Sequence, residues 1–115
     1  MNNLKLKGNK FFKTEEAQWE TADKGITRQM VGFNSQIMMV KIKFEKDAVG
    51  YIHQHFHSQV TYVVSGKFKV TIDGEPKILN EGDGFFVQPN LEHGAECLEA
   101  GMLIDVFSPL REDFL

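Results

Sequence analysis

The stretch GYIHQHFHSQVTYVVSG, residues 50–66, decides how this sequence is read. Three of the chain's four histidines lie in it at alternate positions, His53, His55 and His57, and Gln59 follows with the same spacing. Side chains two residues apart on a β-strand point to the same face. His53 and His55 are therefore expected to converge on one point, and Gln59 joins them if the chain turns at His57 into the next strand.

The alternating polar side chains are candidate metal ligands. Imidazole nitrogens suit Zn, Fe, Ni, Mn or Cu, and His93 is the one remaining histidine that could complete the set. His57 is assigned to the turn and not to the ligands. Two alternatives stay open at this point: the His-x-His pair lies on a surface strand without a metal, or Gln59 only hydrogen-bonds a neighbouring histidine.

A glutamine among the ligands affects the charge of the site. Three imidazoles and a neutral amide leave a divalent site near +2, whereas a carboxylate ligand would lower it to about +1. Such a site is a stronger Lewis acid and attracts an anionic substrate. It is less suited to the oxygen chemistry of iron sites that have a carboxylate ligand.

Composition narrows the class of protein. The chain has 115 residues, a net charge of -3 and no long basic run, so a nucleic-acid partner is not expected. No segment approaches the roughly 20 apolar residues of a membrane span, and no signal peptide is evident. Cys97 is the only cysteine, which rules out an internal disulfide. We expect a soluble, cytoplasmic protein without a membrane partner.

Short β-type runs alternate with turn signals along the chain. Residues 35–45 alternate, with one apolar face, and residues 59–79 predict three strands separated by turns at Ser65-Gly66 and Asp73-Gly74. Residues 93–109 predict two more strands around Ala100-Gly101. This pattern predicts an all-β fold, a single jelly-roll β-barrel with a short N-terminal arm, in one domain over residues 1–115 with its core at about 36–108.

Two segments resemble the two sequence motifs of the cupin superfamily. In the first, G-x5-HxH-x3,4-E-x6-G, three residues match: His53, His55 and Gly66. Gln59 stands at the Glu position, and Asp47 occupies the place of the leading glycine, because Gly50 is displaced.

The second motif, G-x5-PxG-x2-H-x3-N, matches at Gly82 and His93. Gln88 stands for its Pro, Asn90 for its second Gly and Cys97 for its Asn. Asn90 is a reasonable replacement, because asparagine tolerates the left-handed backbone conformation. The resemblance covers residues 36–108 and implies the cupin barrel, a fold that hosts many reactions.

The C-terminal segment LIDVFSPLREDFL adds candidate substrate-handling groups. Asp105 and Phe107 share one face of a predicted strand, which makes Asp105 a candidate general acid/base if that face points inward. Arg111 could hold a substrate carboxylate with two hydrogen bonds. The alternatives are an Asp105 on the outer face and an Arg111 in a surface ion pair.

Together, HxHxHxQ, GDGFFVQPNLEHG and DVFSPLREDF resemble the small pectin-degradation cupins of the KdgF family. This resemblance implies ring opening of 4,5-unsaturated monouronates to linear 4-deoxy-5-keto uronates. It implies one divalent metal (Ni, Zn, Mn or Fe) on His53, His55, Gln59 and His93. It also implies catalytic roles for Asp105 and Arg111 and substrate contacts by Phe107 and Arg111.

Other functions fit the same fold. The alternatives are another metal-dependent cupin enzyme, such as a dioxygenase or sugar isomerase, and a non-enzymatic cupin that binds a sugar acid. Small cupins commonly pair, and an arm carrying Phe11 and Phe12 could add to a sheet edge, so a homodimer is expected.

Overall fold

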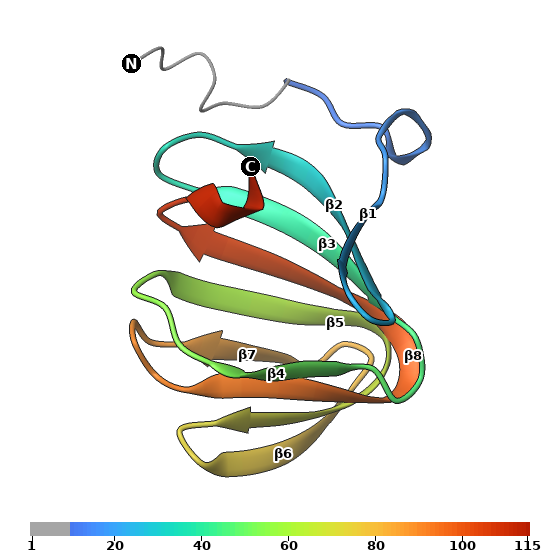
Figure 1. The fold of residues 1–115 in the computed structure, drawn as a ribbon, viewed down its shortest axis with the longest axis vertical. Helices are drawn as coiled ribbons and strands as arrows, with labels where there is room; N and C mark the ends of the chain where they lie inside the picture. Colours follow the sequence, from blue (N-terminus) through green and yellow to red (C-terminus); the bar gives the residue numbers. More distant parts are fainter. Residues whose placement is uncertain (1–9) are drawn as a thin grey trace.

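The computed structural model describes residues 10–115, which form an all-β jelly-roll barrel with an N-terminal arm, as the sequence predicts (Figure 1). The described part of the arm contains the 3-10 turn η2 (Thr14–Glu16), and another such turn, η3 (Glu112–Phe114), lies near the C-terminus. The strands are β1 (Glu20–Asp23), β2 (Ile26–Phe33), β3 (Met38–Phe44), β4 (Val49–His53), β5 (Ser58–Ile72), β6 (Glu75–Asn80), β7 (Gly84–Val87) and β8 (His93–Ser108).

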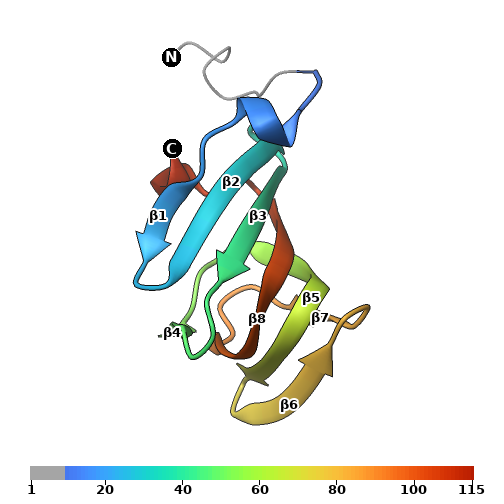
Figure 2. The same ribbon diagram turned by 90° about the vertical axis from the view of Figure 1, so that its right-hand side faces the viewer.

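Two long strands, β5 and β8, connect the two sides of the barrel. They pair with each other over most of their length, in the sheet order β1-β2-β3-β8-β5-β6. The first half of β8 also pairs with β4 and its second half with β3, while β5 pairs first with β7 and then with β6. Figures 1 and 2 show how this arrangement curls the sheet, with β1, β2 and β3 toward one end of the molecule and β6 toward the other.

The structure corrects two predicted turns. Neither Ser65-Gly66 nor Ala100-Gly101 ends a strand, because β5 and β8 each continue through the glycine. Gly66 has φ +86°, and a Cβ there would lie 2.6 Å from the Glu99 carbonyl oxygen. Glycine therefore lets the two strands approach and bend together, with shifts in register where a turn was expected. The predicted Asp73-Gly74 turn is confirmed by the hairpin between β5 and β6.

The described part of the arm covers the outer face of β2 and β3. Gln29 of β2, which is buried there, donates hydrogen bonds from its amide to the carbonyl oxygens of Thr14 and Ala17. Phe11 is exposed and lies outside any strand, while the Phe12 ring lies under Lys41 Nζ at 5.5 Å.

Alternation of side chains along the strands builds the interior. The predicted apolar face of β3 points inward through Met38, Val40 and Phe44, which are buried. Two clusters fill the barrel, one around Phe44 and Phe68 and one around Met38 and Phe107. Within residues 10–115, no helix has the length and apolar character that a membrane crossing requires.

Candidate metal centre

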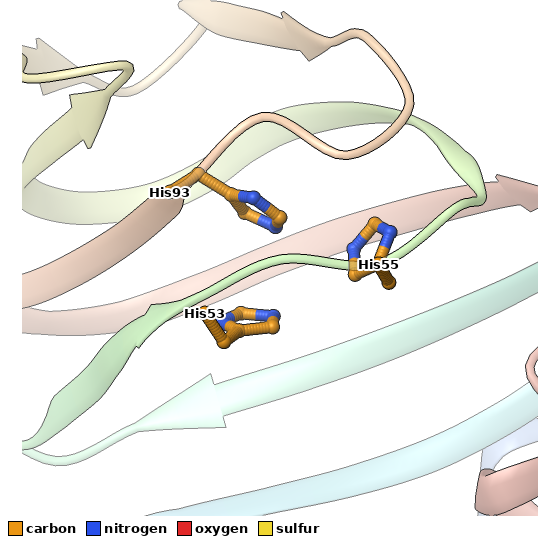
Figure 3. Close-up of side chains that lie close together, drawn as sticks. All are labelled: His53, His55 and His93. Carbon is orange, nitrogen blue, oxygen red and sulfur yellow. The ribbon is translucent and has the colours of Figure 1, made fainter.

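Three histidines from two segments far apart in sequence lie close together (Figure 3): His53 is exposed, His55 is half-buried and His93 is buried. His53 ends β4, His55 lies in the loop that follows, and His93 opens β8 directly opposite His53 in the strand pairing. One ring nitrogen from each of the three lies within 4.8 Å of the others. The structure thus brings together the three histidines that the sequence analysis singled out as ligands.

Backbone carbonyl groups orient all three rings in the same way. Nδ1 of His53 donates to Tyr51 O at 2.8 Å, Nδ1 of His93 donates to Leu91 O at 2.9 Å, and Nδ1 of His55 faces the carbonyl oxygen two residues on at 3.1 Å. A ring whose Nδ1 carries the donated proton keeps the Nε2 lone pair available when it is neutral. This orientation is typical of histidines that bind metals through Nε2.

Gln59, on the inner face of β5, presents its carbonyl oxygen to the same point. Its Oε1 lies 3.0 Å from Nε2 of His55 and 3.2 Å from Nε2 of His93. Burial lowers the pKa of His55, and it lowers the pKa of His93 to about 4, so both rings are neutral near pH 7. Three hydrogen-bond acceptors then face one another, an arrangement that a shared cation would stabilise. The donor set of three imidazoles and one amide oxygen therefore fits a divalent metal.

His57 does not belong to this cluster. It lies in the bend before β5, as predicted, and it is buried. Its Nε2 donates to Leu110 O at 3.1 Å, so its ring has the opposite tautomer to the other three, and its buried Nδ1 has no partner. His57 thereby ties the loop that carries His55 to the C-terminal segment that carries Arg111.

Asp105 faces inward from β8, opposite Thr61 of β5. It is buried, and its Oδ1 accepts a hydrogen bond of 2.6 Å from Thr61 Oγ1. Burial raises the pKa of Asp105 to about 6, although the Thr61 hydrogen bond and the charge of Arg111 act to lower it. A carboxyl group with such a pKa can accept or donate a proton near neutral pH.

Arg111 lines the same cavity and also forms the ion pair that was weighed as its alternative role. Its Nε and Nη2 donate to the Asp113 carboxylate at 3.0 and 2.8 Å. The guanidinium carbon lies 5.2 Å from the ring centre of Phe107 and 4.5 Å from that of Phe114. The two hydrogen bonds to Asp113 use Nε and Nη2, so this ion pair does not engage Nη1 of Arg111.

The sequence analysis missed three side chains near the site. Arg28 of β2 lies over the Phe114 ring at 4.1 Å, and both line a cavity of about 410 Å³ that also reaches His53, Gln59 and Asp105. Thr61, the third, could have been found from its place two residues after Gln59 on the same face of β5. No local pattern in the sequence assigns Phe114 or Arg28 to the site, because the curvature of the sheet and the C-terminal turn bring them together.

Comparison with known proteins identifies related chains. The cupin domain family matches residues 40–107. Over 108 residues the chain is 43% identical to the pectin degradation protein KdgF of Dickeya dadantii (strain 3937), an alignment that covers 92% of this chain and 98% of that protein.

Two solved structures are similar over nearly their whole length. An RmlC-like cupin from Shewanella frigidimarina NCIMB 400 superposes with a TM-score of 0.94 at 51% identity, covering 96% of this chain and 99% of the other. KdgF from Halomonas sp. superposes with a TM-score of 0.90 at 41% identity, covering 94% and 100%.

Proposed function

This chain belongs to the cupin family, and from that premise we propose that it is a metal-dependent enzyme that opens the ring of 4,5-unsaturated monouronates from pectin or alginate breakdown. One observation carries the proposal: a buried carboxyl group, Asp105, shares a cavity with Arg111 and with three of the four candidate metal ligands, His53, Gln59 and His93. The similarity to two KdgF proteins, one of them named for pectin degradation, supports a sugar-derived substrate.

The metal would be held by Nε2 of three histidines and by Oε1 of Gln59. These ligands are His53, His55 and His93, and the metal belongs to the group Ni, Zn, Mn and Fe. When bound, it supplies a positive charge that polarises substrate oxygens and stabilises negative charge as it develops. No anionic ligand reduces that charge, which favours binding of an acidic sugar.

Asp105 moves the proton. The substrate is a cyclic enol ether with a hydroxyl on C1, a double bond between C4 and C5, and a ring oxygen that joins C1 to C5. Ionised Asp105 accepts the C1 hydroxyl proton, an aldehyde forms at C1, and the bond from C1 to the ring oxygen breaks with its electron pair going to that oxygen. Return of the proton to C4 converts the resulting enolate into the C5 ketone. The reaction is an isomerisation, so it needs no further reactant.

Arg111 and the aromatic rings orient the substrate. Arg111 is held by Asp113 and packed against Phe107 and Phe114, so little side-chain freedom remains to be lost when it binds a carboxylate. Phe107 packs against the sugar ring. A fixed carboxylate contact places C1 and C4 relative to Asp105, which lowers the entropic cost of reaction.

Incubation with unsaturated monouronates tests this function. The double bond absorbs in the ultraviolet, and the expected result is loss of that absorbance well above the spontaneous rate, with the linear product identified by mass spectrometry and NMR. Chelator treatment is expected to abolish turnover, and added metal to restore it. A metal-loaded enzyme that leaves every unsaturated monouronate at the spontaneous rate would contradict the proposal.

We also propose that two copies pair through the outer face of the sheet. A row of partly or fully exposed apolar side chains crosses four adjacent strands there, here named the outer row: Met39, Val60, Tyr62, Phe86, Ile104 and Val106. Neighbouring strands lie about 4.8 Å apart, so the row is roughly 15–20 Å wide. Together with the residues around it, the row offers a contact area that can approach the roughly 800 Å² buried per partner in a stable interface. An uncharged row of this kind is self-complementary about a two-fold axis.

A further inference from the structure

The side chain of Gln59 has two ends with opposite hydrogen-bonding character, and their directions differ. Oε1 points to Nε2 of His55 and of His93, while Nε2 of the amide donates to Thr61 Oγ1 at 2.9 Å. Thr61 is almost fully buried, with 1% of its surface exposed, and lies two residues after Gln59 on the same face of β5. The hydroxyl of Thr61 in turn contacts Asp105.

The Thr61 hydroxyl can donate only one hydrogen bond, and this fixes the polarity of the chain of contacts. An ionised carboxylate only accepts, so the Thr61 proton is directed to Asp105 Oδ1. The oxygen of Thr61 is then left as an acceptor, which the amide NH₂ of Gln59 satisfies. A reversed amide would place its carbonyl oxygen against that acceptor and leave two buried oxygens unpaired, at a cost in free energy.

We propose that Thr61 is a positioning residue that holds the Gln59 amide with its carbonyl oxygen toward the three histidines and so connects the metal centre to Asp105. This inference rests on the proposed role of Gln59 as a metal ligand. Only the amide oxygen can bind a metal, because the amide nitrogen has no available lone pair. Thr61 therefore pre-organises the one orientation of Gln59 that completes the donor set.

The same geometry accounts for a glutamine at a position where the cupin motif has glutamate. A glutamate carboxylate has no hydrogen to donate to Thr61. Position 59 and Asp105 would then present two carboxylates to one hydroxyl with a single proton, and one of the buried oxygens would be left unpaired. The neutral amide supplies both a ligand oxygen and the missing donor.

The test measures zinc affinity of the full-length, metal-free protein by competition with a chromophoric chelator. Thr61→Val removes the hydroxyl and keeps the shape, and a loss of about 10- to 100-fold in affinity is expected from a lost contact to a metal ligand. Thr61→Ser keeps the hydroxyl and is expected to bind within about threefold of the unmodified protein. Thr61→Ala removes the same hydroxyl with less bulk and is expected to follow Thr61→Val. Thr71→Val makes the same substitution on the far half of β5 and is expected to leave the affinity unchanged.

A double-mutant cycle with Gln59→Ala separates positioning from a general structural effect. If Thr61 acts through Gln59, Thr61→Val is expected to cause no further loss of zinc affinity in the Gln59→Ala background. The visible spectrum of bound cobalt(II) is expected to change in the same way for Thr61→Val and Gln59→Ala. Unchanged affinity in folded Thr61→Val, or an equal loss with and without Gln59, would overturn the inference.

Failure of this inference is distinguishable from failure of the proposed function. Zinc binding that follows the expected pattern supports the role of Thr61 even if no monouronate is turned over. Turnover of a monouronate together with an unaffected zinc affinity in Thr61→Val would overturn the role of Thr61 and leave the reaction standing.

Discussion

Asp105 is buried and accepts a hydrogen bond from Thr61. Burial disfavours the charged form and raises the pKa of Asp105 to about 6, and the Thr61 hydrogen bond and the charge of Arg111 offset this only in part. The proposed reaction uses the ionised form as the base. Turnover is therefore expected to rise with pH through about 6.

Replacement of Asp105 by asparagine tests its role in proton transfer. Asp105→Asn keeps the size of the side chain but removes the base, so turnover is expected to fall by about 10²- to 10⁴-fold. Zinc affinity serves as the control and is expected to change little, because the side-chain oxygen of asparagine can still accept the hydrogen bond from Thr61 and so leaves the Gln59 amide in place. Full activity in the metal-loaded Asp105→Asn variant would rule out this residue as the acid/base.

The same substitution changes how stability depends on pH. The pKa of Asp105 is raised from its ordinary 3.8 to about 6 on folding, so the folded state holds this proton more tightly and the contribution to stability is lost as pH rises through that window. Burial lowers the pKa of His93 to about 4, which gives a contribution of opposite sign in the same window. The His93 contribution is the same in both proteins, so the difference in unfolding free energy between Asp105→Asn and the unmodified protein leaves the contribution of Asp105.

Urea unfolding of the chelator-treated proteins measures that difference. From pH 4 to pH 7, the free energy of unfolding of Asp105→Asn is expected to rise relative to that of the unmodified protein by up to about 3 kcal/mol, at 1.36 kcal/mol per pKa unit. A difference that stays constant across this range would contradict the raised pKa.

Among the elements, the two long strands position the site. Gln59 and Thr61 lie in the first half of β5, and His93 lies at the start of β8, whose second half carries Asp105. These groups converge because both strands curve through their glycines without ending. Gly66 therefore matters to the site although it lies outside it.

Alanine substitutions at two glycines separate backbone strain from steric contact. Gly66 and Gly74 have similar φ values, +86° and +81°, but a Cβ at Gly66 meets the Glu99 carbonyl at 2.6 Å, whereas one at Gly74 meets nothing within 4 Å. Gly74→Ala is expected to cost about 1–2 kcal/mol of unfolding free energy from strain alone. Gly66→Ala is expected to cost about 3 kcal/mol or more, because the contact adds to the strain. Equal losses of unfolding free energy for the two variants would contradict this prediction, because they would show that β8 moves away from the added Cβ without cost.

For the whole molecule, the inner face of the barrel carries the candidate site, and the outer row lies on the opposite face of the same sheet. Neighbouring residues of β5 serve both, since Gln59 and Thr61 point inward while Val60 and Tyr62 are exposed. Because side chains alternate between the two faces of a strand, residues of the site and residues of the outer row are neighbours in the sequence of β5.

Light scattering tests the homodimer. The unmodified protein is expected to show twice the chain mass of 13.1 kDa, and Val60→Glu is expected to reduce it to 13.1 kDa, because two like charges would meet across the two-fold axis. Ile78→Glu is the matched control: Ile78 is exposed to 48% but lies on β6, outside the outer row, and its variant should remain a dimer. A monomer mass for the unmodified protein at micromolar concentration would contradict the pairing.

The sequence by itself determined the local features of this protein. Alternating residues predicted the inward face of β3, because the two-residue period of a strand is a property of the backbone. His53 and His55 do lie close together, but His55 is in the loop after β4, so the loop and not the strand period sets its direction. The cupin motifs also predicted a left-handed conformation at Asn90, which has φ +68°, and Asp47, in the place of the motif's leading glycine, has φ +71°.

Only the tertiary structure decided which distant groups meet. The pairing of His53 with His93, the Thr61-Asp105 contact and the direction of the Gln59 amide all depend on strand register across the barrel. Register is set by hydrogen bonds between residues far apart in sequence and by the bends at Gly66 and Gly101, which read locally as turns. Gln59 was visible as an unusual residue and Thr61 follows it on the same face of a strand, but the contact of Thr61 with Asp105 became evident only from the pairing of β5 with β8.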